Sequence, residues 1–515
     1  MPSTSENNKR IAKNTLMLYI RMFVIMGVTL YTSRVVLRLL GVTDYGIYNV
    51  VGGIVTMLAF LSNSLSGATS RFIMFELGCG DKESVEQVFR CSASIFYILS
   101  CGALLLAETI GIWFVKSQMN IPLGREAAAM WVYQCSVLTF IISLLSIPYN
   151  SLIIAHERMS VFAYISIFDC TAKLLVVFLL SITPGDKLIV YALLLLGVQI
   201  IVRMIYAIYC KRNFPESNSH WLWKKQLSRK IFSYAGWTLN GNLAVIGYTQ
   251  GINVLLNLFF GPTVNAARAI AVQVQTAITS FFAGFLTAVR PQIIKSYAQN
   301  NLDYTQKLVI SASKYAFFLI LFPGIPLLRD TDYVLRLWLT NVPAHTATLT
   351  RLTIIACMNY TLAQPTIMAI HATGDLRKFQ IVEGTLLLTV LPVAYLLLKF
   401  CHVSPESVLL TYVIIEFITQ FARVWIVYPK IRIPIRTYFT QVLFPIGRVC
   451  IPILVMVLLL PIYNAYNIMS FATNTAAALL CTAAAIYILG FTSEERRTLQ
   501  KKLKGLQGRL AFKGK

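Results

Sequence analysis

The sequence predicts an all-α membrane protein that crosses the bilayer many times. Of its 515 residues, 57% are hydrophobic and only 13% are charged, whereas soluble domains have about 45–50% apolar and about 25% charged residues. Apolar stretches of about 20 residues recur along the chain, and each is long enough to cross a hydrocarbon core of roughly 30 Å. The polar connections between these stretches are short. This composition does not fit a soluble globular enzyme.

Fourteen transmembrane spans are expected from this pattern. They cover residues 14–40, 45–70, 88–115, 127–153, 160–183, 187–210, 231–260, 264–290, 307–328, 346–371, 378–400, 406–429, 448–466 and 469–491. Pro323 and Pro326 are expected to interrupt the ninth span, and Arg448 delays the start of the thirteenth. Because the number of spans is even, both ends of the chain are expected on the same side of the membrane.

The basic residues indicate that this side is the cytoplasm. The chain has 45 Lys and Arg residues against 21 Asp and Glu residues, a formal net charge of +24. With the N-terminus inside, most basic residues between the spans fall on the cytoplasmic side, as the positive-inside rule requires. The excess favours contact with anionic membrane lipids, and nucleic acid is the weaker interpretation.

The interior of the sequence contains a repeat. Three residues near the connection between spans four and five recur 217 positions later, near the connection between spans ten and eleven. The pairs are Pro148 and Pro365, Ala155 and Ala372, and Phe162 and Phe379. In the same way, Gly41 and Arg71 bracket the second span as Gly261 and Arg290 bracket the eighth. Six spans separate the copies, so the two halves share one orientation in the membrane.

This repeat predicts the domain organisation. The predicted regions are an N-lobe at 1–210, a cytoplasmic linker at 211–230, a C-lobe at 231–429, two additional helices at 430–491 and a basic amphipathic cytoplasmic tail at 492–515. In the tail, leucines follow a helical spacing among Lys and Arg residues, which indicates a helix at the membrane surface. A frayed basic tail is the alternative.

Ionisable side chains inside the spans are the first candidates for function. Such groups are costly in hydrocarbon unless they face water, a partner or a substrate. They are Arg21, Arg34 and Arg38 in the first span, Asp169 and Lys173 in the fifth, Arg203 in the sixth, Arg268 in the eighth, and Glu416 and Arg423 in the twelfth. Cations predominate among them.

Structural roles offer alternatives for several of these charges. Asp169 and Lys173 are four residues apart and can neutralise each other, and Glu416 and Arg423 lie two turns apart on one helix. The other two arginines of the first span are close enough to its ends to reach the interface. Arg34 is harder to explain in this way, since it lies roughly 10 Å from the centre of its span at about 1.5 Å per residue.

Polar stripes follow the second and eighth spans, and further amides follow the seventh. The second span carries Asn49, Thr56, Asn63 and Ser70 at intervals of seven, the eighth carries Arg268, Gln275 and Thr279, and the seventh adds Asn240, Gln250, Asn253 and Asn257. A water-filled cavity between the two halves would explain these stripes. Hydrogen bonds between helices are the alternative for the seventh span.

The sequence contains no recognisable catalytic constellation. The five histidines are dispersed, the ten cysteines are scattered without a CxxC pair, and no HExxH, P-loop or GxSxG motif occurs. We therefore expect no catalytic residue, no metal site, no bound cofactor and no site for ATP hydrolysis. A transport cycle would then depend on an ion gradient, the membrane potential or the supply of substrate.

Three segments resemble a known family. They are SRVVLRLLGVTDYGIYNVV across the first turn, GATSRF at the end of the second span, and IPYNSLIIAHERMSVF between the fourth and fifth spans. They are similar to the oligosaccharide flippases that export O-antigen and capsule repeat units. These proteins belong to the polysaccharide biosynthesis family of the multidrug/oligosaccharidyl-lipid/polysaccharide (MOP) exporter superfamily. The similarity in layout covers essentially the whole chain.

The resemblance implies a transporter and not an enzyme. In such proteins, two six-helix lobes form a V around a central cationic cavity, with two C-terminal helices added. They move undecaprenyl-diphosphate-linked oligosaccharide from the cytoplasmic to the periplasmic leaflet of the bacterial inner membrane by alternating access. The polysaccharide polymerase and the chain-length machinery are implied partners. The product would be O-antigen of lipopolysaccharide, capsule or exopolysaccharide.

On this basis we assign roles to the candidate residues. Arginine forms bidentate, charge-assisted hydrogen bonds to phosphate oxygens, and amide and aromatic side chains suit sugars. We expect Arg34, Arg268, Arg203 and Lys173 to bind the diphosphate, Asn240, Gln250, Asn253, Asn257 and Trp237 to contact the glycan, and Asp169, Glu416 and Arg423 to act in gating or ion coupling. The coupling ion would be H⁺ or Na⁺.

Two other functions fit part of the pattern. A flippase for the lipid-linked peptidoglycan precursor also has fourteen spans and a cationic cavity. A membrane glycosyltransferase or polysaccharide polymerase would also place arginines near phosphate, but it should have a large loop outside the membrane or clustered acidic residues. Drug/cation antiporters of the same superfamily fit less well, because a cationic cavity repels cationic drugs.

Overall fold

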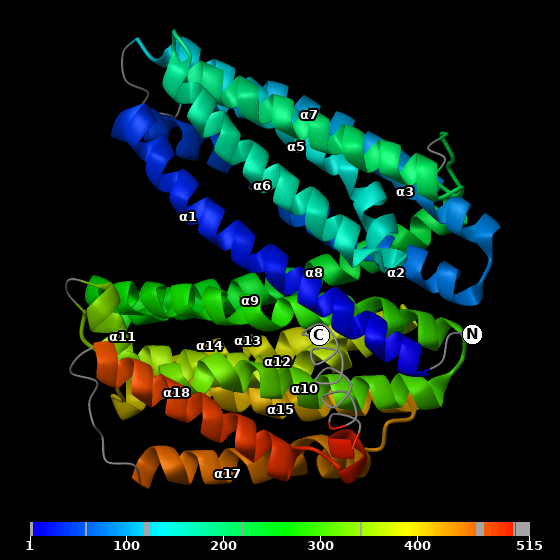
Figure 1. Ribbon diagram of the computed structural model, residues 1–515. Helices are drawn as coiled ribbons and strands as arrows, with labels where there is room; N and C mark the ends of the chain where they lie inside the picture. The colour runs from blue at the N-terminus through cyan, green and yellow to red at the C-terminus, as the bar shows by residue number, and fades with distance from the viewer. Residues whose placement is uncertain are drawn as a thin grey trace, which may run out of the picture. The chain divides into compact units, whose positions relative to one another are not determined.

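The computed structural model describes residues 4–56, 59–117, 124–217, 220–339, 342–459, 468–497 and 500. In this part of the chain the regular structure is entirely helical (Figure 1). The helices are α1 (Thr4–Thr56), α2 (Ala59–Cys79), α3 (Lys82–Leu106), α4 (Ile112–Ser117), α5 (Glu126–Ala155), α6 (Met159–Ile182), α7 (Lys187–Asn213), α8 (Lys225–Phe260), α9 (Pro262–Ala298), α10 (Leu302–Arg329), α11 (Thr331–Trp338), α12 (Thr346–Thr373), α13 (Arg377–Leu388), α14 (Val390–Cys401), α15 (Glu406–Ile431), α16 (Ile435–Tyr438), α17 (Phe444–Leu459) and α18 (Ile468–Ala485), with π-helical turns η1 (Ala107–Gly111), η2 (Phe439–Leu443) and η3 (Ile486–Gly490).

Twelve helical segments within the described residues are long and apolar enough to cross a membrane. This confirms the predicted class of a polytopic α-helical membrane protein. Of the fourteen expected spans, 45–70 and 346–371 are not among the twelve. The second of these corresponds to α12, which has 28 residues and is therefore long enough, but no 18-residue stretch within it is apolar enough. The first runs from the end of α1 into α2 and includes residues 57–58, which lie outside the described residues.

Two expected span limits differ from the structure. Pro323 and Pro326 lie inside a continuous α10 and do not interrupt it. The helical segment of the thirteenth span begins at Ile435 rather than at Arg448. Arg448 lies inside this segment, with its guanidinium 5.6 Å from the centre of the Phe444 ring, a contact that favours a cation beside an aromatic face. Residues 460–467 at the end of this expected span, and the tail beyond residue 500, lie outside the described residues.

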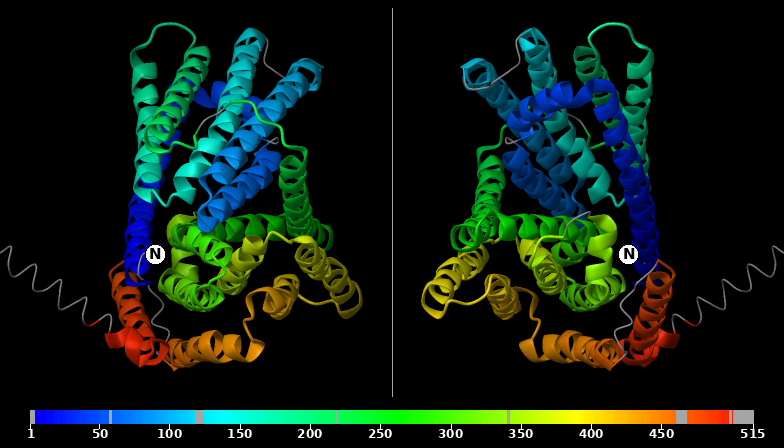
Figure 2. Two further views of the ribbon diagram at one scale, coloured as in Figure 1. Left: turned by 90° about the vertical axis from the view of Figure 1, so that its right-hand side faces the viewer. Right: turned by 90° about the vertical axis from the view of Figure 1, so that its left-hand side faces the viewer.

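The chain divides into two compact units. Unit 1 comprises Met1–Asn240, Thr287–Asn301 and His371–Arg377, and unit 2 comprises Gly241–Leu286, Leu302–Ile370 and Lys378–Lys515. In unit 1, α5 packs on α7 and α1 packs on α6 (Figure 1). In unit 2, α17 and α18 pack on each other and on α10 (Figure 2). The lobe limits expected from the sequence stay a prediction.

The backbone turns support the repeat. Ten of the eleven residues with positive φ in the described part of the chain form five pairs separated by 217 to 221 positions. The pairs are Gly41 and Gly261, Gly80 and Asn300, Gly124 and His345, Glu157 and Gly374, and Gly185 and His402. A left-handed residue is a common way to end a helix, and glycine adopts this conformation without strain. The two halves therefore bend the chain at corresponding places, even where the residue types differ.

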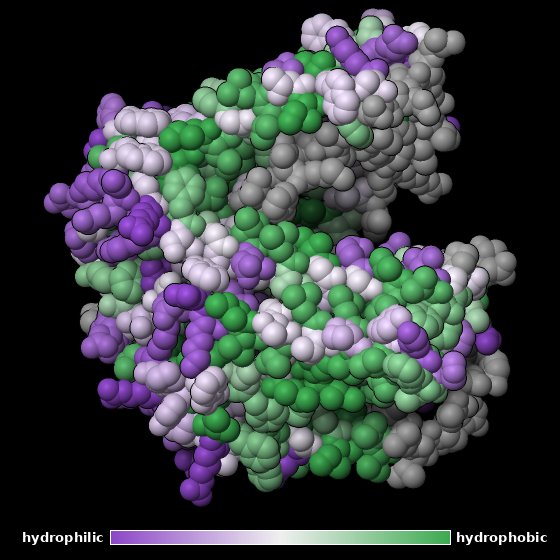
Figure 3. Space-filling model, turned by 180° about the vertical axis from the view of Figure 1, so that it is seen from behind, coloured by the Kyte–Doolittle hydropathy of each residue, from purple (hydrophilic) through white to green (hydrophobic). Residues whose placement is uncertain are grey.

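The exterior is largely apolar. Many large hydrophobic side chains are exposed, among them Ile182, Leu258, Phe400 and Leu480, which are all at least 69% exposed. On the face shown in Figure 3, hydrophobic residues cover broad areas and hydrophilic residues gather toward one edge. Such a surface suits contact with lipid tails.

Candidate functional site

Arg268 is a buried cation in unit 2. It lies on α9, is only 5% exposed, and its Nη1 donates a 3.0 Å hydrogen bond to Thr353 Oγ1 on α12. Its buried Nε has no hydrogen-bond partner among the described residues. Arg268 is in none of the described ion pairs, and the carboxylates Glu383 and Glu416 of this unit bind Arg423 instead. A guanidinium that is buried without a carboxylate is suited to bind an anion.

Two tyrosines belong to the same core as Arg268. Tyr248 on α8 donates a 3.3 Å hydrogen bond to the hydroxyl of Tyr412 on α15, and the two rings stack with their centres 5.3 Å apart. Apolar residues such as Ile252 and Ala267 pack around them and exclude water. The surroundings of Arg268 therefore offer hydroxyl groups and aromatic faces but little negative charge.

A second charged cluster in unit 2 joins two carboxylates to one arginine. Arg423 Nη1 donates to Glu416 Oε1 at 2.9 Å on α15, and Arg423 Nε donates to Glu383 Oε1 at 2.7 Å on α13. Arg423 Nη2 also contacts Glu383. Arg423 and Glu416 are each only 2% exposed. With both carboxylates ionised, this cluster has a net charge of −1, so it is suited to take up a cation or a proton.

Gln420 extends this acidic cluster. Its side-chain nitrogen donates a 2.7 Å hydrogen bond to the Tyr438 hydroxyl, and its oxygen lies 3.5 Å from Arg423 Nη1. The residue is 4% exposed. The prediction paired Glu416 with Arg423 and missed Glu383, which completes the cluster from a neighbouring helix. Glu383 could have been found from the sequence, because it is a charged residue inside the eleventh expected span, where such residues are candidates for function.

Three of the expected charged site residues, Asp169, Lys173 and Arg203, lie on α6 and α7 of unit 1. Lys173 Nζ donates a 2.8 Å hydrogen bond to Asp169 Oδ2, so the expected pair one helical turn apart is formed. Asp169 Oδ1 is buried and has no hydrogen-bond partner among the described residues. The Arg203 guanidinium lies 4.2 Å from the centre of the Tyr149 ring, and its buried Nη1 likewise has no described partner. These residues are therefore partly buried, and two of their polar atoms, Asp169 Oδ1 and Arg203 Nη1, lack a hydrogen-bond partner among the described residues.

Arg21, for which the sequence allowed a role at the interface, belongs to the same unit. Its guanidinium lies 4.5 Å from the centre of the Phe162 ring, and its buried Nε has no described hydrogen-bond partner. The side chain of Arg34, the strongest expected ligand of the first span, lies outside the described residues. The same is true of the side chains of Asn49 and Thr56.

The expected glycan contacts lie along α8. Trp237 and Asn240 belong to unit 1, where the Arg377 guanidinium lies 5.9 Å from the centre of a Trp237 ring. In unit 2, Asn253 Nδ2 donates a 3.2 Å hydrogen bond to Gln250 Oε1. The side chains of Asn240, Gln250 and Asn257 are exposed, which leaves their amide groups available for polar contacts.

The family-like GVTDYG segment has a structural role in unit 1. Its Asp44 accepts a 2.9 Å hydrogen bond from Arg125 Nε, and Arg125 Nη1 donates a 2.5 Å hydrogen bond to Asp186. Arg125 therefore ties together the turns that precede α5 and α7 and the segment around Asp44. Burial alone would raise the pKa of Asp186, but the hydrogen bonds from Arg125 and the Leu188 N–H outweigh it, and the pKa is lowered.

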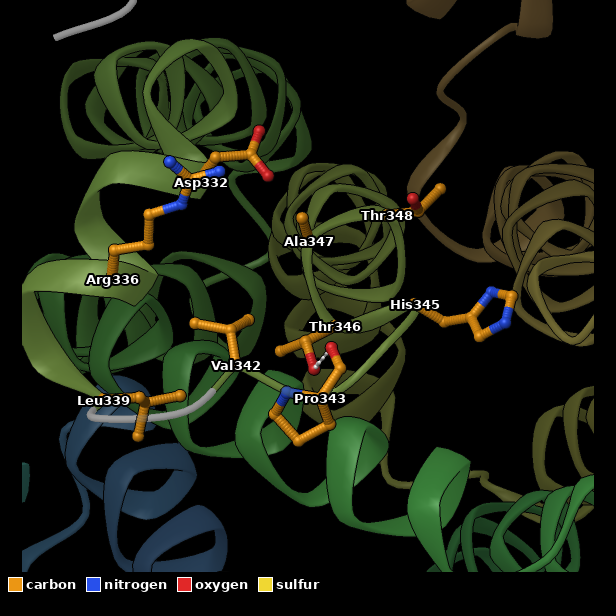
Figure 4. Close-up of a pocket in the computed structure, with 9 residues that line it drawn as sticks. All are labelled: Asp332, Arg336, Leu339, Val342, Pro343, His345, Thr346, Ala347 and Thr348. Carbon is orange, nitrogen blue, oxygen red and sulfur yellow. Dashed lines mark hydrogen bonds between the residues drawn. The ribbon is translucent and has the colours of Figure 1, made fainter. Parts of the chain in front are cut away.

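A separate pocket of about 450 Å³ opens on unit 2 (Figure 4). Its lining residues are Asp332, Arg336, Leu339, Val342, Pro343, His345, Thr346, Ala347 and Thr348. Of the lining residues, Asp332 forms an ion pair with Arg351 and His345 shares a hydrogen bond with Glu406, each at 2.6 Å. None of the expected substrate-binding residues lines this pocket.

The described residues contain no group of three or more His, Cys, Asp or Glu side chains that could hold a metal ion. The ten cysteines are free thiols.

Comparison with known proteins identifies relatives in sequence and in structure. Residues 11–296 match the model of a family described as polysaccharide biosynthesis protein. Among solved structures, a MATE transporter in the bent conformation is 15% identical, with a TM-score of 0.71, and the match covers 83% of this chain and 96% of that chain. No curated protein sequence matches the chain.

Two further solved structures have a similar fold. An outward-facing multidrug resistance MATE family transporter of the MOP superfamily is 14% identical, with a TM-score of 0.71 and coverage of 83% of this chain and 96% of that chain. A MOP superfamily transporter from Pyrococcus furiosus, described as having a binding pocket of reversed polarity, is 14% identical, with a TM-score of 0.68 and coverage of 82% and 96%. At this identity the likeness establishes the fold alone.

Proposed function

The chain belongs to the polysaccharide biosynthesis protein family and has the fold of MATE transporters, and from this premise we propose that it is a flippase for lipid-linked oligosaccharide. The substrate is an undecaprenyl-diphosphate-linked repeat unit, moved from the cytoplasmic to the periplasmic leaflet of the bacterial inner membrane. The product supplies O-antigen, capsule or exopolysaccharide synthesis. Both chain ends face the cytoplasm in this proposal.

The buried Arg268 is the observation that carries the proposal. It combines 5% exposure, a free buried N–H and the absence of a carboxylate partner among the described ion pairs. A diphosphate supplies the negative charge and the acceptor oxygens that this guanidinium lacks. Arg203 supplies a second incompletely satisfied guanidinium in unit 1, and Lys173 supplies an ammonium. We assign Arg34 to the same ligand on the basis of its sequence position.

The amide-rich face of α8 supports a role in sugar recognition. Asn240, Gln250 and Asn257 expose amide groups that both donate and accept hydrogen bonds, as sugar hydroxyls require. Asn253 pairs with Gln250, which orients both amides. Trp237 adds a flat aromatic surface of the kind that packs on sugar rings. The polyprenyl chain remains in the lipid.

Substrate transport tests this assignment directly. Purified protein in proteoliposomes is given a fluorescent undecaprenyl-diphosphate oligosaccharide, and translocation is followed for the wild type and for Arg268→Met. We expect a loss of about tenfold or more, because hydrogen bonds to a charged group are among the stronger polar contacts. Arg436→Met, which removes an exposed arginine of the same unit, is the matched control and should transport normally.

The outcomes separate the alternative functions. Preference for a lipid-linked peptidoglycan precursor would reassign the substrate within the same transport class. Elongation of glycans without translocation would replace the flippase by a glycosyltransferase or polymerase. Normal transport by Arg268→Met would keep the flippase and remove Arg268 from the binding site.

The acidic cluster of unit 2 is proposed as the coupling site for H⁺ or Na⁺. Glu383 and Glu416 share the single guanidinium of Arg423, so one carboxylate charge is left uncompensated. Proton or sodium uptake would neutralise it, and the pairing with Arg423 would then change. The Asp169–Lys173 pair is a candidate gate in unit 1, since its carboxylate is only partly satisfied.

Imposed gradients test the coupling. Transport is measured with a pH gradient, with a sodium gradient and without either, for the wild type and for Glu383→Gln. We expect the variant to lose the response to the gradient while it keeps binding of the lipid-linked substrate. Glu406→Gln, at the start of the same helix as Glu416, should respond like the wild type. An unchanged response in Glu383→Gln would remove this cluster from coupling.

A further inference from the structure

The segment that joins α7 to α8 carries exposed aromatic and basic side chains. Trp221, Trp223 and Phe232 are 59%, 45% and 46% exposed. Lys225 and Arg229, in the first turns of α8, are exposed as well. We call these five residues the linker patch. All of them belong to unit 1, and neither the transport site nor the coupling cluster uses them.

Helix α3 holds the backbone of this segment in place (Figure 1). Arg90 Nε donates a 3.2 Å hydrogen bond to the carbonyl oxygen of His220, and the Leu222 N–H donates a 3.1 Å hydrogen bond to Ser94 Oγ. The two bonds start from residues four apart on α3, which share one face of the helix. Trp221 lies between the two bonded residues of the linker. The protein therefore fixes the backbone on both sides of an exposed tryptophan.

The first turns of α8 bury one face and expose another. On the buried face, Ser228 is 2% exposed, and its Oγ lies 3.2 Å from Cys91 Sγ on α3. On the exposed face, Lys225, Arg229 and Phe232 follow one another at intervals of four and three residues, so they lie along one stripe of the helix. The contact with α3 thus turns this stripe away from the interior of unit 1.

Aromatic rings connect the stripe to the segment before it. The ring centres of Trp223 and Phe232 lie 6.5 Å apart. Trp221 and Trp223 flank Leu222, which is less exposed than either of them. Tryptophan combines a large apolar ring with one N–H donor, so it is suited to the boundary between hydrocarbon and lipid headgroups. Exposed rings beside cations are therefore typical of a surface that meets a membrane.

The cations of the linker patch lack counter-ions in the described part of the chain. Neither Lys225 nor Arg229 takes part in any of the described ion pairs. The only carboxylate in the sequence between residues 211 and 232 is that of Glu216, which is buried. The positive charge of the patch is thus available to an anionic ligand outside the protein.

The position of the patch along the chain places it at the membrane surface. It lies between two segments that are long and apolar enough to cross a membrane, Lys187–Asn213 and Lys225–Phe260. Helix α8 has 36 residues and is therefore about 54 Å long, whereas the hydrocarbon core is roughly 30 Å thick. Its first turns therefore extend into the headgroup region. In the proposed orientation this is the cytoplasmic leaflet, where anionic lipids attract basic segments.

We propose that the linker patch is a binding site for anionic phospholipids. Lys225 and Arg229 bind the lipid phosphates by charge-assisted hydrogen bonds, and the three aromatic rings pack against the glycerol and the upper part of the acyl chains. A lipid is favoured over a soluble acidic partner, because the segment joins two membrane spans and its rings need an apolar neighbour. The proposal does not depend on the identity of the transported substrate.

Photo-crosslinking measures this binding directly. Full-length protein is reconstituted in phosphatidylcholine vesicles that contain a small amount of phosphatidylglycerol with a photoreactive group near its headgroup. Labelled peptides are then identified by mass spectrometry. We expect labelling within residues 220–232, and far less labelling of this segment by phosphatidylcholine that carries the same photoreactive group. Equal labelling by the two probes would overturn the proposal.

Removal of the two charges is the decisive comparison. Lys225→Gln with Arg229→Gln should lower labelling by at least about tenfold, because one basic residue near an anionic surface contributes about fivefold to binding. Lys225→Arg with Arg229→Lys keeps both charges and should be labelled like the wild type. Lys13→Gln with Arg436→Gln removes two exposed cations elsewhere in the chain and is the matched control. Unchanged labelling in the first of these variants would overturn the proposal.

Protein stability does not confound this test. The substitutions change exposed side chains, so the unfolding temperatures should stay close to that of the wild type. If the double glutamine variant fails to fold, Arg229→Gln alone decides, with an expected loss of about fivefold. Trp221→Ala removes a ring without a charge and should also lower labelling.

Competition separates other ligands of the same patch. Unlabelled phosphatidylglycerol should compete with the probe. Undecaprenyl diphosphate that competes better at an equal amount would make the patch a contact for the transported lipid, and it would overturn the assignment to bulk phospholipid. Crosslinks from residues 220–232 to a soluble protein in cells, without labelling by phosphatidylglycerol in vesicles, would overturn the proposal in favour of a protein partner.

Discussion

The ammonium of Lys314 lies 2.7 and 2.8 Å from the two carboxylate oxygens of Glu495, although the residues are 181 positions apart. Lys314 is buried within α10, and Tyr315 adds a 2.6 Å hydrogen bond to the same carboxylate. Glu495 also accepts a 2.7 Å hydrogen bond from the Thr492 N–H, while its own N–H donates to Thr492 Oγ1. These reciprocal bonds form a capping box that starts the C-terminal segment.

Removal of one member of this ion pair should be costly. Glu495→Gln leaves the Lys314 charge buried without a counter-ion, and we expect the free energy of unfolding to fall by about 3–5 kcal/mol. Thermal unfolding in detergent measures the loss. The double variant Glu495→Gln with Lys314→Met should recover most of it, since no uncompensated charge remains. Equal stability of the single variant and the wild type would contradict this account.

Gly374 should not tolerate a side chain. Its φ of 79° disfavours any other residue, and a Cβ would lie 2.7 Å from Arg71 Nη2. We expect Gly374→Ala to lower the free energy of unfolding by about 2 kcal/mol, of which about 1–2 kcal/mol comes from the backbone. Gly197→Ala is the matched control, because Gly197 lies inside α7 with no atom within 4 Å of a new Cβ. This control should be neutral or stabilising by up to about 1 kcal/mol.

Arg125 should stabilise unit 1 through its two carboxylate partners. The side chains of Arg125 and Asp44 are 28% and 19% exposed, so water weakens the pairing only in part. We expect Arg125→Ala to lower the free energy of unfolding by about 2 kcal/mol, read as a lower unfolding temperature. Glu86→Ala, which removes a single partly exposed ion pair with Arg90 one turn away on the same helix, should cost about 0.5 kcal/mol or less. A similar effect of the two variants would show that Arg125 is only a surface charge.

Acid should weaken the contact between His156 and Glu216. His156 Nε2 lies 2.6 Å from Glu216 Oε1, and this hydrogen bond lowers the pKa of Glu216. Because the native pKa lies below that of the unfolded chain, about 4.3, the contribution to stability is fully present above that value. It is lost as the pH falls through the lower, native pKa.

Unfolding temperatures of wild type and Glu216→Gln across this pH range test the assignment. The difference between the two proteins should be largest near neutral pH and should shrink in acid. A difference that stays constant down to the lowest pH would contradict the role of Glu216 ionisation.

The sequence predicted contacts along one helix better than contacts between helices. The Asp169–Lys173 bond follows from the helical period alone, because residues four apart share a face. Glu383 joins Arg423 from another helix, 40 positions away, and no spacing rule relates the two. Gln292, which donates a hydrogen bond to Glu157, is more distant still from its partner, at 135 positions. Such contacts depend on how helices pack, which the period of one helix does not encode.

The repeat illustrates the same limit. Gly41 and Gly261 could be paired from the sequence, because both copies kept glycine at a helix break. Glu157 and Gly374 adopt the same turn with different residues, so residue identity hides the relation that the backbone keeps. The length of the apolar stretch predicted α12, but the polar residues within this helix lower its mean hydropathy. It is therefore not among the twelve segments that are apolar enough to cross a membrane. Membrane spans can therefore be predicted from composition, whereas the paired turns are recognised only from their backbone conformation.

The five paired turns also make the chain its own reference. At three of them, one copy has glycine and the other has asparagine or histidine: Gly80 and Asn300, Gly124 and His345, and Gly185 and His402. One polypeptide thus carries both variants of each of these three turns, at equal abundance. Exchange of the two residues within a pair therefore measures how much each turn depends on the residue type that occupies it.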